Sequence, residues 1–123
     1  MEWTIVLNEE NQYVEVVTSG VADRDGSLNM VKAISLTMPE NKMKKILIDH
    51  TGISSVSGKI IEIYNRPDEF NEIGVIRNVM VAEVVKPEHK KFFNFLETVF
   101  VNRGFIFSIF ENRKSALKWL LKL

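Results

Sequence analysis

The chain has 123 residues, a length typical of one folded domain, and we expect a single domain over residues 1–123. Basic and acidic residues number 16 each, so the net charge is zero, which argues against a nucleic-acid-binding protein because such a protein needs a basic face. The chain has no cysteine, which excludes disulfides, thiolate catalysis and iron–sulfur clusters.

The beginning of the chain and its apolar runs bear on localisation. The first ten residues lack the basic and apolar segments of a secretory signal. The longest apolar runs are a few residues, far short of the ~20 that span a bilayer. We therefore expect no membrane span and a cytoplasmic location.

Two strands are expected first. Residues 3–7 and 13–18 are rich in β-forming side chains and are joined by about five polar residues, which is the pattern of a β-hairpin. We expect the chain to leave the sheet at Gly20. Asp23 or Asp25 then caps a helix, because a short carboxylate accepts hydrogen bonds from the free amides of the first turn.

Apolar residues at helical spacing extend this helix to Pro39, where we expect it to stop. Residues 45–49 have a short, unbroken apolar centre, which suits a strand buried on both faces. Residues 51–57 are rich in small hydroxyl side chains and are predicted to be a loop. Residues 58–64 then form a short helix.

Pro67 disfavours helical geometry at the residue before it, so we expect a break or kink there, with Gly74 as the end of the helical region. Residues 78–82 read as another buried strand. Pro87 begins a helix with a broad aromatic face. Residues 105–110 are the last strand.

Asn112 is predicted to cap a final helix. The predicted order is β-β-α-β-α-β-α-β-α. Strands that alternate with helices favour an α/β fold with a mainly parallel central sheet and about four helices, and the opening hairpin adds an antiparallel edge.

Four patterns in this order resemble a known family over nearly the whole chain. They are the strand 45–49 with a small-residue loop ending Ser57-Gly58 at a helix start, the helix through Phe70 into a strand at 77–82, the aromatic helix before the last strand, and Phe110-Glu111-Asn112 before the closing helix. In order and spacing they resemble the SpoIIAA-like branch of the STAS domains, the fold of the anti-sigma-factor antagonists. That branch is related in fold to the lipid-binding CRAL-TRIO (Sec14-like) domains.

The resemblance departs from the family at the phosphorylation site. In sigma-regulating STAS domains this loop reads Asp-Ser-Ser-Gly, and a partner kinase phosphorylates its first Ser. The matching stretch here is Ser55-Val56-Ser57-Gly58, so the acceptor position holds Val56, which has no hydroxyl. Ser54, Ser55 and Ser57 remain as alternative acceptors.

Asp49, His50 and the serines lie near one strand end, where open α/β sheets bind ligands. A Ser-His-Asp hydrolase is disfavoured, because adjacent Asp49 and His50 point to opposite faces of a strand and the chain lacks a Gly-x-Ser-x-Gly turn. We expect the Ser57 hydroxyl to cap the next helix instead. His50 and His89 have no metal-ligand spacing, so we expect no metal, and the chain lacks a phosphate-binding P-loop, so we expect no cofactor.

Seven of the eight phenylalanines lie between residues 92 and 110. A helix and strand that cover the sheet account for most of them as core. The aromatic residues of the helix cover a wider arc than the one face that a surface helix buries. We therefore expect some of them to line a pocket or a subunit contact.

Together these observations favour a non-enzymatic binding or regulatory module of the SpoIIAA-like type, with a protein partner and a homodimer formed near the second or third helix. The alternative is a carrier of a small apolar or lipid-like ligand, held between helices and sheet by Tyr64, Phe92, Phe95 and Leu96. A second alternative is a phospho-switched regulator that uses Ser54, Ser55 or Ser57. An enzyme is the least favoured class.

Overall fold

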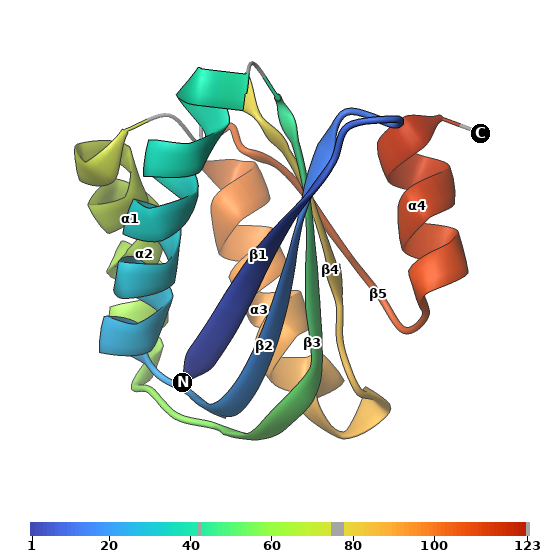
Figure 1. Ribbon diagram of the computed structural model, residues 1–123. Helices are drawn as coiled ribbons and strands as arrows, with labels where there is room; N and C mark the ends of the chain where they lie inside the picture. Colours follow the sequence, from blue (N-terminus) through green and yellow to red (C-terminus); the bar gives the residue numbers. More distant parts are fainter. Residues whose placement is uncertain (42, 75–77, 123) are drawn as a thin grey trace.

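The computed structural model describes residues 1–41, 43–74 and 78–122. In chain order its elements are β1 (Glu2–Asn8), β2 (Tyr13–Ala22), α1 (Arg24–Asn41), β3 (Lys45–Val56), α2 (Ile60–Ile73), β4 (Met80–Val84), the 3-10 helix η2 (Pro87–His89), α3 (Lys90–Asn102), β5 (Ile106–Phe110) and α4 (Arg113–Leu121) (Figure 1). The strands form one sheet in the order β1-β2-β3-β4-β5. β1 and β2 are antiparallel and the other pairs are parallel, which confirms the predicted α/β architecture.

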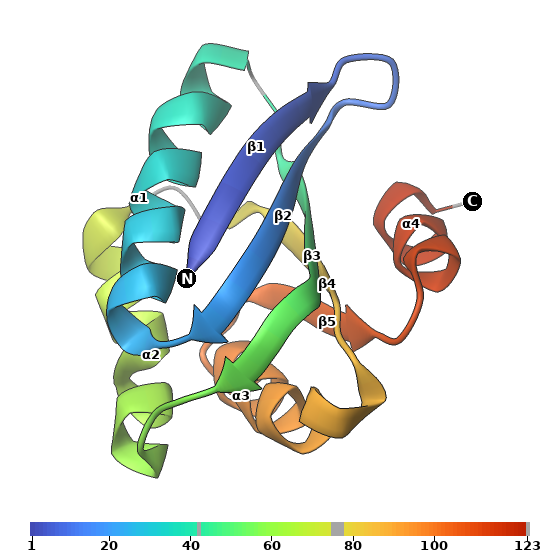
Figure 2. The same cartoon turned by 60° about the horizontal axis from the view of Figure 1, so that its bottom comes forward.

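The helices cover the two faces of the sheet unequally. α1, α2 and α3 lie on one face, the three-helix face, and α4 lies alone on the other, the α4 face (Figures 1 and 2). Side chains of successive strand residues alternate between the faces. Val14, Ile46, Ile48 and Val81 therefore pack under the three helices, while Leu47 and Ala82 pack under α4.

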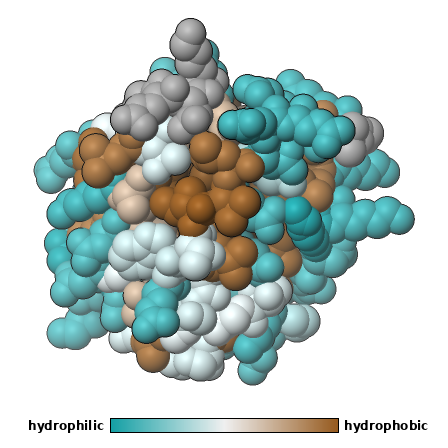
Figure 3. Space-filling view, in the orientation of Figure 1, coloured by the Kyte–Doolittle hydropathy of each residue, from teal (hydrophilic) through white to brown (hydrophobic). Residues whose placement is uncertain are grey.

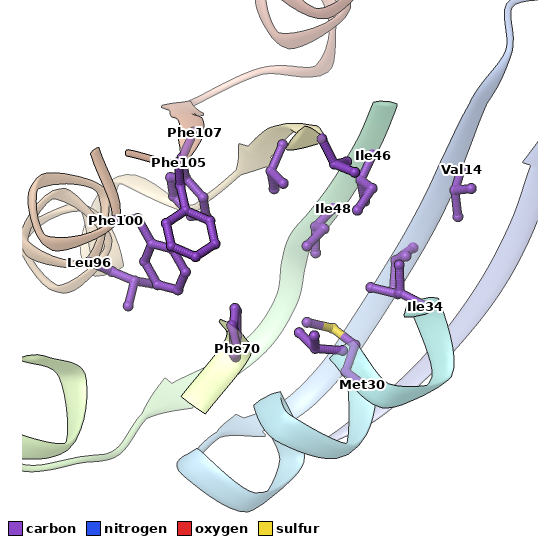
Figure 4. Close-up of a cluster of buried hydrophobic side chains, with 14 of the residues drawn as sticks. Val14, Met30, Ile34, Ile46, Ile48, Phe70, Leu96, Phe100, Phe105 and Phe107 are labelled. Atoms are coloured by element: carbon purple, nitrogen blue, oxygen red, sulfur yellow. The ribbon is translucent and has the colours of Figure 1, made fainter. Parts of the chain in front are cut away.

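Aromatic side chains fill much of the core on the three-helix face. Phe100 of α3 stacks on Phe107 of β5 with ring centroids 5.0 Å apart, and it also contacts Phe105 and Phe70 (Figure 4). The predicted core role of the phenylalanines between residues 92 and 110 is confirmed for Phe93, Phe100, Phe105 and Phe107, all of which are buried. Apolar surface also remains exposed: in Figure 3 apolar side chains gather over β1, the edge strand that contains half-exposed Val6.

β2 and β3 are longer than the sequence predicted. Gly20 does not leave the sheet: it pairs with Ile53, and its φ of 86° accompanies an irregularity in the β2–β3 register. Residues 51–56 are strand rather than loop, because β2 supplies backbone partners as far as the pairing of Ala22 with Val56. Only the tertiary pairing decides this, since small hydroxyl residues are neutral between a strand and a loop.

The prediction at Pro39 was wrong, and at Pro67 the predicted break does not occur. α1 continues past Pro39 to Asn41, and α2 is one helix through Pro67. A proline in a helix removes one hydrogen bond, a cost that tertiary packing can offset. α2 packs on both α1 and α3. Its end at Gly74 is confirmed, with φ of 89°. Arg77, at the start of the strand predicted over 77–82, lies outside the described residues.

The predicted helix caps are partly confirmed. Asp23 Oδ1 accepts from the backbone N–H of Gly26 at 2.7 Å, and Asn112 Oδ1 accepts from the N–H of Ser115 at 2.8 Å. Ser57 is not a cap, because α2 begins at Ile60 and its N-cap residue is Lys59. The backbone N–H of Ser57 instead donates to the carbonyl of Ala22, which extends the β2–β3 pairing.

Candidate functional site

A row of buried polar side chains crosses the three-helix face, from the middle of β2 and β3 to the carboxyl end of β4. Thr18 of β2, His50 of β3 and Glu83 of β4 point to this face because each is in phase with the apolar residues before it. Nδ1 of His50 lies 2.7 Å from Oγ1 of Thr18, and Nε2 lies 3.3 Å from Oε2 of Glu83. The predicted opposite orientation of Asp49 and His50 is confirmed, since Asp49 is partly exposed on the other face.

The His50 ring is held rigidly between these partners. It stacks on Phe93 of α3 with ring centroids 5.0 Å apart. The second carboxylate oxygen of Glu83, Oε1, is buried and has no hydrogen-bond partner among the described residues. Both ring nitrogens of His50 and Oε2 of Glu83 therefore have partners, whereas Oε1 of Glu83 has none among the described residues.

α2 adds a buried cation to the same region. The Arg66 side chain is directed inward, and the residue is only 3% exposed. Nε and Nη2 of its guanidinium have no hydrogen-bond partner among the described residues. Burial lowers the pKa of Arg66, partly offset by the nearby carboxylates of Glu69 and Glu62, but a guanidinium stays protonated at physiological pH.

These groups face one small pocket of about 30 Å³ between the sheet and the three helices. Arg66, His50 and Glu83 supply its polar wall. The remaining wall is mostly apolar, and Figure 4 shows several of its side chains converging: Met30, Ile48, Phe70, Phe100, Phe105 and Phe107. Half-buried Ser27 in the first turns of α1 lines another part of the pocket.

Thr18, His50 and Glu83 follow one another as the hydroxyl, the imidazole and the carboxylate do in a Ser-His-Asp catalytic triad. A nucleophile must reach substrate, however, and Thr18 is almost completely buried. Its hydroxyl also lies 3.1 Å from the backbone carbonyl of Asp49, to which it donates. The geometry therefore supports binding of a small polar group rather than attack by Thr18.

A second candidate site lies on the surface, where β3 leads into α2. Exposed Ser54, Ser55 and Ser57 adjoin the first turns of α2, whose apolar residues face solvent. Ile60 is 75% exposed, Ile61 60% and Tyr64 52%. We call Ser54, Ser55, Ser57, Ile60, Ile61 and Tyr64 the β3–α2 surface (Figure 2).

The residues predicted to hold an apolar ligand do not gather around the pocket. Tyr64 and Phe95 are exposed, Leu96 is buried in the core, and Phe92 packs at the core's margin. None of the four lines the pocket described above. Tyr64 instead contacts Arg103, whose guanidinium carbon lies 4.8 Å from the ring centroid.

Sequence reasoning missed Thr18, Arg66 and Glu83. Glu83 had a usable signal, since it is the only charged residue in the otherwise apolar run from Val79 to Val85. His50 was considered only as part of a Ser-His-Asp site or as a metal ligand, whereas it is buried and bonded across strands. Nothing in the sequence marked Arg66 as buried, because an arginine on a helix that carries both polar and apolar residues is ordinarily exposed to solvent.

Among the described residues, no helix is both long and apolar enough to cross a membrane. The same part of the chain holds no group of three or more potential metal ligands among its histidine, aspartate and glutamate side chains.

No protein-family model and no curated protein matches this sequence. Several solved structures are similar, and two of them illustrate the likeness. One is the anti-sigma factor antagonist SpoIIAA in its unphosphorylated form, with a TM-score of 0.55, 13% identity, and coverage of 99% of this chain and 100% of that one. The other is an uncharacterized DUF3478-family protein with a SpoIIAA-like fold from Shewanella loihica PV-4, with a TM-score of 0.54, 16% identity, and coverage of 97% and 92%. The chain therefore has a SpoIIAA-like fold of the STAS type. The implied relation to CRAL-TRIO domains stays a prediction.

Proposed function

We propose that this SpoIIAA-like chain is a non-enzymatic binding module that regulates a protein partner through the β3–α2 surface. The observation that carries the proposal is the pair of adjacent, largely exposed isoleucines, Ile60 and Ile61, followed one turn later by exposed Tyr64. Soluble proteins rarely gather large apolar side chains on one exposed helix end without a partner.

The chemistry of this surface suits a protein partner. Tyrosine and isoleucine bury large apolar areas on association, and tyrosine is enriched among the residues that dominate binding energy. The serines around them supply hydrogen bonds at the rim, as is usual for interfaces. SpoIIAA, one of the similar solved structures, is described as an anti-sigma factor antagonist, a role that acts on another protein.

A phospho-switch is a second form of the same function. Ser54, Ser55 and Ser57 are exposed, so a kinase could reach each hydroxyl. A phosphoryl group there would add negative charge beside apolar Ile60 and Ile61 and would change the partner's affinity. The intact mass of protein purified from its own host tests this form, because a phosphoryl group survives denaturation.

A capture experiment tests the proposal. Tagged chain is incubated with lysate of the source organism, and bound proteins are identified for the wild type, for an Ile60→Lys, Ile61→Lys double variant, and for Leu36→Lys. Leu36 is the matched control, because it is 76% exposed on α1, away from the β3–α2 surface.

We expect one protein to be captured by the wild type and by the Leu36 variant and to be lost from the double variant. Light scattering of the purified wild type separately tests the predicted homodimer. Equal capture by all three forms would contradict the assigned surface.

A further inference from the structure

We propose that the pocket on the three-helix face binds a short-chain carboxylic acid that carries a hydrogen-bond donor on its second carbon, namely a 2-hydroxy or 2-amino acid. This site is separate from the β3–α2 surface and does not depend on the function proposed for it. It rests on the two buried, unpartnered polar groups that face one small space, Arg66 and Glu83.

Arg66 selects the carboxylate. Nε–H and Nη2–H lie on the same edge of the planar guanidinium and donate in parallel, which matches the two oxygens of one carboxylate. Both atoms are buried and lack a partner among the described residues. The carboxylates of Glu69 and Glu62 offset the burial of this cation only in part, so an anion that accepts from this edge stabilises it further.

Glu83 selects the donor. Its Oε2 is taken by His50, which Thr18 holds from the other side of the ring. Glu83 lines the pocket, its Oε1 has no partner among the described residues, and a carboxylate oxygen without a proton only accepts hydrogen bonds. A ligand with a carboxylate alone would leave this oxygen unsatisfied, whereas a hydroxyl or ammonium group donates to it.

Charge balance points to the same class. A zwitterionic amino acid adds no net charge to the buried site. A 2-hydroxy acid adds one negative charge next to the guanidinium. A phosphate dianion adds two beside Glu83, and like charges in a buried site repel strongly. Inorganic phosphate is therefore a suitable negative probe.

The size of the pocket limits the ligand to a short chain. Its volume is about 30 Å³, and one water needs about 10–15 Å³, so as it stands it takes about two waters. A ligand of a few carbons needs an outward shift of α2, which contributes Arg66 and Phe70.

The structure provides for that shift. α2 packs on α1 and α3, and glycines with positive φ flank it: 145° at Gly58 and 89° at Gly74. Met30, on the opposite wall, is unbranched and adapts its shape easily. An outward displacement of α2 between these two glycines admits the ligand.

Calorimetry of the wild type tests the site with four probes: 2-hydroxyisovalerate, valine, isovalerate and inorganic phosphate. We expect one of the first two to bind at least about tenfold more tightly than isovalerate, which lacks only the donor, because hydrogen bonds to charged groups are worth at least that ratio. Phosphate should show no saturable binding. Isovalerate binding as tightly as both donor-bearing acids, or none of the acids binding at millimolar concentration, would overturn the proposal.

Variants assign the roles of the two residues. Arg66→Lys keeps the charge but loses the paired donors, so we expect at least about tenfold weaker binding. Arg103→Lys is the matched control and should bind as the wild type does, since Arg103 pairs with Asp68 at the surface. Glu83→Gln should reduce the ratio between the binding affinity for the donor-bearing acid and the binding affinity for isovalerate. Unchanged binding by Arg66→Lys would refute the assignment.

A measurement on the wild type alone guards against variants that fail to fold. Methyl NMR during titration with 2-hydroxyisovalerate and with valine should shift the Met30 and Ile48 signals, which line the pocket. The methyl signals of exposed Ile60 and Ile61 serve as controls and should not shift. Saturable shifts at Ile60 and Ile61 but not at Met30 would place the ligand elsewhere and would disprove the pocket site.

Discussion

The two faces of the sheet differ in what they bury. Under α4 the buried cluster consists of apolar or aromatic side chains, among them Leu47, Ala82 and Leu120, and its one hydroxyl, on Tyr13, lies 3.1 Å from Nη2 of Arg113. Under α1, α2 and α3 a larger apolar core surrounds buried Arg66 and Glu83, both with unpartnered polar atoms. The α4 face is what stability alone requires, whereas the three-helix face carries groups that stability does not explain.

This comparison predicts that substitutions of two buried residues, Leu120 on the α4 face and Arg66 on the three-helix face, change the free energy of unfolding in opposite directions. Leu120 of α4 is completely buried in its cluster, so Leu120→Ala should lower the free energy of unfolding by about 2–5 kcal/mol. Denaturant titration measures the loss. Leu36→Ala, at an exposed position on a helix, should change the free energy by less than about 0.5 kcal/mol. Equal effects at both positions would mean that α4 is not firmly docked.

Arg66 should behave in the opposite way. Arg66→Met replaces a buried, unpartnered cation with an apolar chain of similar length, so we expect stability to stay the same or to rise, by up to about 1–4 kcal/mol. Thermal and denaturant unfolding without added ligand measure it. A clear loss of stability would show that the guanidinium is a structural group, and the contrast between the two faces would then disappear.

A smaller effect is expected at the start of α4. Asn112→Ala removes the side chain that accepts from the Ser115 N–H, at a cost of about 1 kcal/mol. Ser57→Ala is the matched test at the start of α2, where Ser57 is not the cap, and it should change the free energy of unfolding by less than about 0.5 kcal/mol. A loss of about 1 kcal/mol from Ser57→Ala would restore the capping role that the sequence suggested.

The smallest effect is expected at the rim of the α4 face. Arg113 pairs with Glu15 across the junction of α4 and β2 and is about half exposed, so Arg113→Ala should cost about 0.2–1 kcal/mol. Stability curves at low and high salt measure the effect, and salt should reduce it because exposed charges are screened. A cost that does not depend on salt would point to lost packing against Tyr13 instead.

The order of strands and helices was predictable from the sequence, because hydrophobic periodicity and capping residues are local signals. Asp23, Gly74 and Asn112 mark helix ends as expected. The lengths of β2 and β3 were not predictable, because backbone partners alone make residues 51–56 a strand. The continuity of α2 through Pro67 likewise depends on its packing against α1 and α3.

For the candidate sites, the sequence by itself singled out Ser54, Ser55, Ser57 and Tyr64, whereas the exposure of Ile60 and Ile61 emerged only from the structure. Only the tertiary structure brought Arg66 and Glu83 to one pocket and placed Thr18 and His50 beside them. These residues come from α2 and from three strands far apart in the sequence. Periodicity shows which face of an element is buried, but it does not show which buried groups meet. That depends on the register of the strands and on the docking of α2.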